Sequence, residues 1–185
     1  IDKNNLDLIF EIDRGKETRI SKISFTGDKK VREKRLRDVI ASEEYKFWKF
    51  ISRNTKFSQN LIDLDKRLLE NYYKSAGYYD VKISSQSAEL NPESHEVEIT
   101  YSIDAGNRYL IKKIITNVDP VFDKNLFYSL NDKFEKIIGK YYSPFKIKLL
   151  LEDIDELIEK KNLQFVEHNV EEIVDGDSIV VKFNI

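Results

Sequence analysis

Apolar and polar residues alternate along residues 6–12, and the same pattern returns along residues 97–103 after a shift of 91 positions. Each run is followed three residues later by a glycine, Gly15 or Gly106. Alternation with a period of two is typical of a strand that buries one face. A third run of this kind, residues 179–185, ends the chain. The three runs therefore predict closing strands of a repeated unit.

The residues after each glycine also match. Under the same shift of 91, Ile20 and Ile23 fall on Ile111 and Ile114. We therefore expect each glycine to separate the strand that closes one unit from the strand that opens the next.

Two long helices are predicted from apolar residues three and four positions apart, because residues at these spacings share one helix face. In residues 58–74 the expected buried stripe is Leu61, Leu64, Leu68 and Tyr72. In residues 143–161 it is Ile147, Leu150, Ile154 and Ile158.

The ends of the long helices carry recognisable signals. Ser143 followed by Pro144 is typical of a helix start. Gly77 and Asn162 occupy equivalent places at the two C-terminal ends, and both residue types tolerate the left-handed conformation that terminates helices.

A shorter helix is predicted before each long one, within residues 31–44 and 121–134. Strands are expected after the long helices, at about residues 79–90 and 164–174, before the closing strands. The fold class is therefore α+β, with two tandem β-α-α-β-β modules. Each module is a three-stranded mixed sheet with two helices on one face.

The repeat also predicts the domain boundaries. Residues 1–14 would be the closing strand of a preceding module, residues 15–105 the first complete module, and residues 106–185 the second. The chain contains no methionine, so we expect it to be a processed chain or a piece of a longer one.

Composition narrows the possible chemistry. The 31 Lys and Arg residues nearly balance the 33 Asp and Glu residues, which argues against nucleic-acid binding. The absence of cysteine excludes disulfides and thiol catalysis. No apolar run approaches the roughly 20 residues of a membrane helix.

No set of residues points to catalysis. His95 and His168 lie in different parts of their units and form no metal-ligand spacing. The acidic residues 152–159 and the basic residues 29–37 are interpreted as solvated helix faces. We therefore expect no enzyme activity, no cofactor and no metal.

Aromatic residues cluster between the two helices of the first unit. Two interpretations stay open: a small satellite core, or a docking patch for a partner, since Trp and Tyr are enriched at binding hot spots. The candidate patch consists of Tyr45, Phe47, Trp48 and Phe50.

Two segments carry a resemblance to a known family. The segments "ISKISFTGDKKV", residues 20–31, and "YYKSAGYYDVKI", residues 72–83, in a tandem β-α-α-β-β order, resemble the POTRA domain of the Omp85 superfamily. The first unit, with Trp48 between its helices, is similar to the third POTRA domain of an outer-membrane protein assembly factor, and the second unit is similar to the fourth.

The resemblance implies a periplasmic scaffold at the outer membrane of a Gram-negative bacterium. Its implied partners are unfolded outer-membrane protein clients, accessory assembly lipoproteins, adjacent POTRA modules and a C-terminal membrane β-barrel. In this family the strand after the second helix is an open edge that pairs with partner strands. Carried onto residues 79–88, the implied edge site is Tyr79, Val81, Lys82, Ile83, Ser84, Ser85 and Gln86, and the inter-module joint is Asp104, Ala105 and Gly106.

Other functions remain open from the sequence. A TamA-like or two-partner-secretion transporter would share the modules. An RNA-binding α+β repeat belongs to a different class, and the balanced charge argues against it. An enzyme would need a convergent polar set that the sequence lacks.

Overall fold

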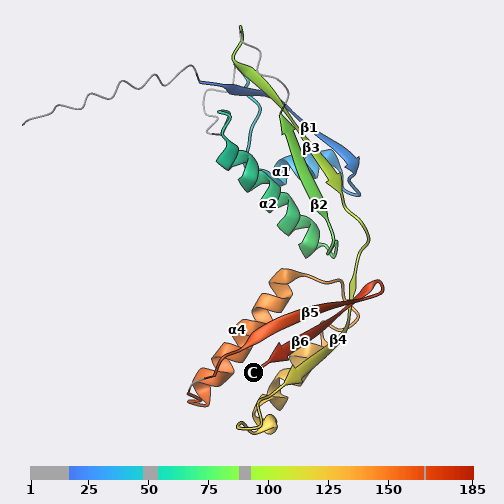
Figure 1. The fold of residues 1–185 in the computed structure, drawn as a ribbon, viewed down its shortest axis with the longest axis vertical. Coiled ribbons are helices and arrows are strands. Elements are labelled where there is room, and N and C mark those ends of the chain that lie inside the picture. The colour runs from blue at the N-terminus through green and yellow to red at the C-terminus, as the bar shows by residue number, and fades with distance from the viewer. Residues whose placement is uncertain (1–16, 48–53, 88–92, 165) are drawn as a thin grey trace, which may run out of the picture.

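The computed structural model describes residues 17–47, 54–87, 93–164 and 166–185. The strand expected at residues 6–12, the proposed closing strand at residues 1–14, Trp48 and Phe50 lie outside these residues. The described chain forms two modules that lie end to end along the long axis of the molecule (Figure 1).

The first module contains a mixed three-stranded sheet among the described residues. Its strand order is β1-β3-β2, with β1 (Arg19–Asp28) parallel and β2 (Lys82–Ser87) antiparallel to the central β3 (Glu96–Asp104). The helices α1 (Glu33–Val39) and α2 (Gln59–Ser75) precede β2 in the chain. This is the predicted β-α-α-β-β order.

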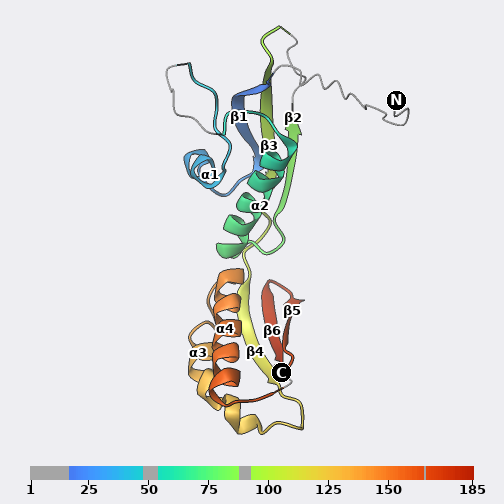
Figure 2. The same cartoon turned by 90° about the vertical axis from the view of Figure 1, so that its left-hand side faces the viewer.

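The second module repeats this architecture. Its sheet has the order β4-β6-β5, again with a parallel first pair and an antiparallel second pair. Figure 2 shows its helices on one side of the sheet. The elements are β4 (Leu110–Asn117), η1 (Lys124–Leu130), α3 (Asn131–Glu135), α4 (Pro144–Lys160), β5 (Asn169–Asp175) and β6 (Ser178–Asn184). The predicted fold class is confirmed.

The repeat extends to irregularities in the backbone. The pairing of β1 with β3 shifts register between Ile20 and Lys22, and the pairing of β4 with β6 shifts between Ile111 and Lys113. The two shifts are 91 positions apart, as the sequence repeat predicts. A bulge of this kind reverses which residues of the strand turn their backbone outward.

The buried face of α2 differs from the predicted one. The structure buries Ile62, Asp65, Leu69 and Tyr73, one position after the predicted stripe. Leu64 of that stripe remains 36% exposed. The predicted and the observed stripes have the same spacing. The observed stripe contains the carboxylate of Asp65, so the hydrophobic pattern favoured the wholly apolar predicted stripe. In α4 the prediction is confirmed for Ile147, Leu150 and Ile154, which are buried.

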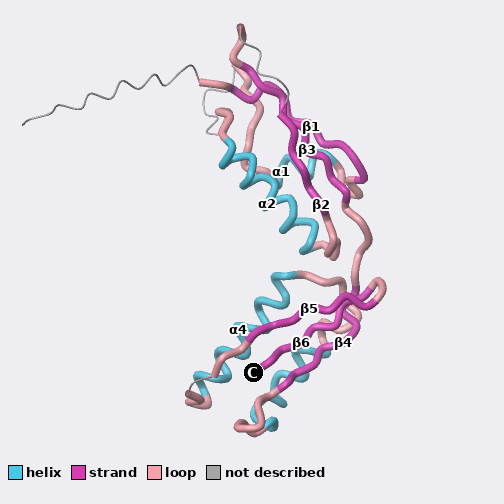
Figure 3. The backbone as a smooth tube through the Cα atoms, viewed as in Figure 1, coloured by secondary structure: helices cyan, strands magenta, loops and turns pink. Residues whose placement is uncertain are grey.

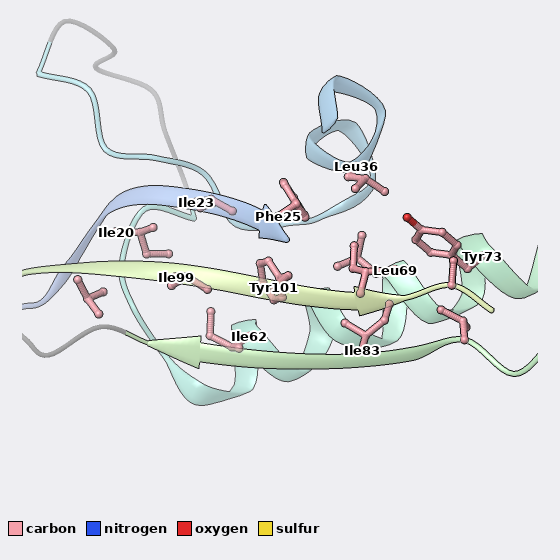
Figure 4. Packing of buried hydrophobic residues seen from close by; sticks show 14 residues of the cluster. Ile20, Ile23, Phe25, Leu36, Ile62, Leu69, Tyr73, Ile83, Ile99 and Tyr101 are labelled. Atoms are coloured by element: carbon pink, nitrogen blue, oxygen red, sulfur yellow. The ribbon is translucent and has the colours of Figure 1, made fainter. Parts of the chain in front are cut away.

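Asp65 is buried because it accepts three hydrogen bonds. Its Oδ1 accepts from the backbone N–H of Ala41 (2.7 Å) and of Ser42 (3.1 Å), and its Oδ2 accepts from the Tyr101 hydroxyl (2.6 Å). Burial and this hydrogen bond raise the pKa of Tyr101. The carboxylate thus links α2 to the central strand and to the segment after α1, and Figure 4 shows Tyr101 among the surrounding core residues.

The predicted helix ends are confirmed. Gly77 has φ +99° and Asn162 has φ +51°, the left-handed conformation expected at both positions. At both ends the next residue donates its N–H to a carbonyl inside the last helical turn, Tyr78 to Tyr73 and Leu163 to Ile158.

Both strands after the long helices begin later than predicted. β2 begins at Lys82 rather than near residue 79, and β5 begins at Asn169 rather than near residue 164. In the first module the delay has a physical cause, because Tyr79 packs against the second module.

Replacing Asp65 with alanine should lower the free energy of unfolding by about 3 kcal/mol, because two buried N–H groups and the Tyr101 hydroxyl lose their acceptor. Urea unfolding measures the loss. The control Asp63→Ala changes an exposed residue of the same helix and should cost no more than about 0.5 kcal/mol. Equal losses in the two variants would contradict the assigned role of Asp65.

Candidate functional site

Strand β2 is an edge of the first sheet among the described residues. The hydrogen bonds at the two ends of β3 show which way its backbone faces. The His95 carbonyl accepts from the Arg19 N–H (2.9 Å), and the Ala105 N–H donates to the Asp28 carbonyl (3.2 Å). Both lie on the β1 side. Because the backbone direction alternates along a strand, the even-numbered residues of β3 face β2.

This alternation determines the outward backbone of β2. Lys82 and Ser84 lie opposite Asp104 and Ser102, which are even-numbered, so these two residues bond to β3. Ile83 and Ser85 therefore turn their N–H and C=O groups away from the sheet.

The side chains of this edge alternate as predicted where they are described. Val81 and Ile83 are buried, whereas Lys82 and Ser84 are exposed. The side chain of Gln86 lies outside the description. Partner binding by these residues remains a prediction.

Tyr79 does not belong to the edge strand. Its ring lies 5.0 Å from the Tyr142 ring and 5.9 Å from the Tyr109 ring, measured between centroids, and both contacts are edge-on. Tyr109 and Tyr142 belong to the core of the second module. The prediction placed Tyr79 in the partner site because sequence alternation does not show contacts between modules. The structure places it at the joint.

The predicted joint residues form the covalent connection between the sheets. β3 ends at Asp104, Ala105 is fully buried, and Gly106 has φ +64° with no atom near the position of an added Cβ. Figure 3 shows the chain passing from β3 into β4 through this connection. The non-covalent contacts that join the modules lie beside it.

Two residues after the connection bind the C-terminal end of α2. Arg108 Nε donates to the Ala76 carbonyl (2.8 Å), and the Tyr109 N–H donates to the Gly77 carbonyl (2.8 Å). Both satisfy carbonyls at a helix end, where intrahelical donors run out. The Tyr109 hydroxyl also donates to the Asp80 carboxylate. The helix end of one module is thus capped by the other.

Gly77 is required at this contact for two reasons. Its φ of +99° is unfavourable for other residues, and an added Cβ would lie 3.0 Å from the Cβ of Tyr141. The Arg108 guanidinium lies 3.3 Å from the centroid of the Tyr141 ring, a cation–π contact. The close approach of the modules therefore depends on the missing side chain.

Tyr79 and Tyr142 at the joint have raised pKa values. Burial raises the pKa of Tyr142, as does its hydrogen bond to Glu172 (2.7 Å). Burial and Glu172 also raise the pKa of Tyr79. Both effects raise the pKa values further above 10. The two hydroxyl groups therefore stay protonated at neutral pH, and their hydrogen bonds persist there.

The candidate aromatic patch is described only in part. Phe47 is 75% exposed, and the Arg19 guanidinium lies 4.4 Å from the centroid of the half-exposed Tyr45 ring. Trp48 and Phe50 lie outside the described residues. Both interpretations of this cluster, a satellite core and a docking patch, therefore stay predictions.

Metal and membrane features are not found in the described ranges. His168 Nε2 lies 2.6 Å from Asp155 Oδ1, an exposed pair. No group of three or more His, Asp or Glu residues could hold a metal ion in the part of the chain that the structure describes. Within that part, no helix has both the length and the apolar character needed to cross a membrane.

Replacing Tyr79 with alanine should loosen the two modules, because aromatic pairs contribute about 0.5–1.5 kcal/mol beyond the area they bury. Residual dipolar couplings measure the effect. One alignment tensor should fit both modules of the unmodified chain, and the variant should need two. The control Tyr128→Ala removes a tyrosine that is 61% exposed within the second module, and it should keep one tensor. A single shared tensor in Tyr79→Ala would contradict the assigned role.

Comparison with known proteins gives consistent matches. Residues 18–106 match the POTRA family model, described as a surface antigen variable number repeat. The outer membrane protein assembly factor BamA of Neisseria meningitidis is 20% identical over 185 residues, covering 98% of this chain and 22% of that protein. BamA of Buchnera aphidicola is 25% identical over 150 residues, covering 74% of this chain and 24% of that protein. The chain therefore spans less than a quarter of these relatives.

Solved structures show the same fold. The POTRA3-5 fragment of BamA from Haemophilus influenzae has a TM-score of 0.59 at 15% identity, covering 91% of this chain and 61% of that one. BamA from Haemophilus ducreyi lacking POTRA domains 1-3 has a TM-score of 0.61 at 16% identity, covering 90% of this chain and 29% of that one. The first module therefore matches the POTRA family over residues 18–106, and the second module, which repeats the β-α-α-β-β architecture, shares the fold of these solved POTRA domains.

Proposed function

We propose that this chain is part of the periplasmic scaffold of an outer-membrane protein assembly factor in a Gram-negative bacterium. The similarity to BamA proteins over most of the chain supports this assignment. The proposed scaffold has no enzyme activity. Further POTRA modules and a C-terminal membrane β-barrel would lie in the rest of the protein, and the module boundaries would be residues 1–14, 15–105 and 106–185.

The proposed partners are unfolded outer-membrane protein clients and accessory assembly lipoproteins. The observation that carries this proposal is the outward backbone of Ile83 and Ser85 on the edge strand β2. An extended segment would add to this edge by β-augmentation, in which main-chain hydrogen bonds supply affinity without demanding one sequence. That suits a scaffold that receives many different β-rich clients.

The side chains of β2 suit transient pairing. The exposed face carries Lys82 and Ser84, which are polar, and the strand is only six residues long. Short edge strands with polar or charged side chains limit uncontrolled pairing with other chains. The edge can therefore accept a partner strand while resisting aggregation.

The transporter alternative within the superfamily would use the same modules for a narrower set of clients. The full-length relatives that match are named as assembly factors, which favours the assembly role. The balanced charge continues to argue against the RNA-binding alternative.

Replacing Ser85 with proline tests the edge site, because it removes an outward N–H and leaves the hydrogen bonds to β3 intact. Binding of a fluorescent 15-residue peptide from a strand of an outer-membrane β-barrel should weaken at least about 10-fold, equal to about 1.4 kcal/mol. Fluorescence anisotropy measures the affinity.

The matched control Gln59→Pro places proline at the first position of α2, where helices tolerate it, and should leave the affinity unchanged. Circular dichroism checks that both variants fold. Unchanged affinity in folded Ser85→Pro would reject the β2 site.

A further inference from the structure

The first strands of the two modules, β1 and β4, are equivalent edges with different surroundings. Near the start of each strand, a loop hydrogen-bonds to the outer edge. The Ile20 N–H donates to the Thr55 carbonyl (2.8 Å), and the Ile111 N–H, 91 positions later, donates to the Lys140 carbonyl (2.9 Å). Both residues therefore face away from their sheets.

Beyond this point the outer side of β1 is covered by three side chains, Lys29, Arg37 and Glu44, here named the β1 cover. Glu44 Oε1 accepts from the Ile23 N–H (3.0 Å), and Arg37 Nη2 donates to the Ile23 carbonyl (2.5 Å). Lys29 Nζ donates to the Phe25 carbonyl (3.0 Å). These side chains occupy the positions that the backbone of a neighbouring strand would take.

The β1 cover is itself bonded together. Arg37 Nη1 lies 2.7 Å from Glu44 Oε1. Burial alone would raise the pKa of Glu44, but the Ile23 N–H and Arg37 outweigh it and lower that pKa below its usual value. The carboxylate is therefore ionised at neutral pH, and the β1 edge is closed to a further strand.

In β4 the equivalent positions are Ile114 and Thr116. The Asn117 carbonyl accepts from the Ile185 N–H (2.8 Å) and so faces the β6 side. Alternation then turns the backbone of Ile114 and Thr116 outward. Among the described residues, no hydrogen bond reaches these outward N–H and C=O groups. In the described part of the second module, no side chain bonds to these groups as the β1 cover bonds to β1.

An apolar hollow of about 360 Å³ borders this open edge, here named the β4 hollow. Alternate residues from β4 onward form one wall, and η1, α3 and the following turn form the other. The main apolar lining residues are Ile114, Val118, Phe127, Phe134 and Ile138. By contrast, the hollow beside β1 includes the charged residues Arg37, Glu44 and Lys46.

We propose that the outer edge of β4 and the β4 hollow form a second docking site, for an extended segment of another protein. The segment would hydrogen-bond to the backbone of Ile114 and Thr116 as an added strand. One of its apolar side chains would enter the hollow, because side chains of a strand point alternately to the two faces. An added strand satisfies both the main-chain groups and the apolar wall, whereas a helix would leave the main-chain groups unpaired.

Charge near the site defines the partner further. Lys113, Lys124 and Lys136 lie on or beside the lining elements, and so do the acidic residues Asp123, Asp132 and Glu135. Within the described part of the chain, none of these six side chains makes a salt bridge. Because the two signs balance, the favoured segment alternates apolar and polar residues and has little net charge. This site lies in the second module and is independent of the β2 edge.

The test uses the whole chain and a synthetic ten-residue peptide that alternates valine or phenylalanine with threonine and has one lysine and one aspartate at its ends. In NMR titrations the amide signals of Ile114 and Thr116 should shift on binding. Thr116→Pro removes an outward N–H without touching the ladder to β6. Ile138→Asp places a charge in the β4 hollow.

Each variant should weaken binding, followed at the Ile114 amide signal, at least about 10-fold. The control Ser85→Pro alters only the β2 edge and should leave binding at β4 unchanged. Urea unfolding identifies any variant that fails to fold, and either of the two β4 variants suffices for the test.

Three results would overturn the proposal: no shift at Ile114 and Thr116 in the unmodified chain, shifts confined to Ile83 and Ser85, or equal affinity in a folded Thr116→Pro variant. Shifts at Ile114 and Thr116 without shifts at Ile83 and Ser85 in the unmodified chain would reject the first proposed site and support this one.

Discussion

A three-stranded sheet satisfies the backbone on both sides of only its central strand. Here β3 and β6 have strands on both sides, and the outer strands of each sheet turn alternate N–H and C=O groups away from their partners. Each such group needs a partner from a loop, a side chain, water or another chain. The N–H groups of Ile20 and Ile111 donate to loop carbonyls. The N–H and carbonyl of Ile23 instead bond to the charged side chains of Glu44 and Arg37. The two modules share one fold but differ in the partners of these outward backbone groups.

The alternating pattern predicted the strands because each sheet has one buried face, which produces a period of two. The shift of 91 positions also relates the bulges beside Ile20 and Ile111, so the repeat extends to local irregularities of the backbone. The stripe of α2 was predicted one position too early because Asp65 is buried through hydrogen bonds rather than through apolar character. Hydrophobic periodicity does not reveal a carboxylate whose partners, Ala41, Ser42 and Tyr101, are distant in sequence.

The candidate edge site came from the resemblance to the POTRA domain, which implied that the strand after the second helix lies at an edge. The structure has β2 at an edge, and Ile83 and Ser85 lie in that strand. Tyr79 was misplaced because its partners lie in the other module, on elements that no local pattern connects to it. The sequence did not predict the contrast between the edges of β1 and β4 either. That contrast depends on the hydrogen bonds of the Arg37 and Glu44 side chains to the backbone of Ile23.

Native-state hydrogen exchange of single amides distinguishes the covered edge of β1 from the open edge of β4. The Ile23 N–H bonds to a carboxylate and should exchange slowly, at a rate close to that of its neighbours in the ladder. The N–H groups of Ile114 and Thr116 should exchange at least about 10-fold faster than those of Ile115 and Asn117, which face β6. Equal protection of all four β4 amides, or fast exchange at Ile23, would contradict the account.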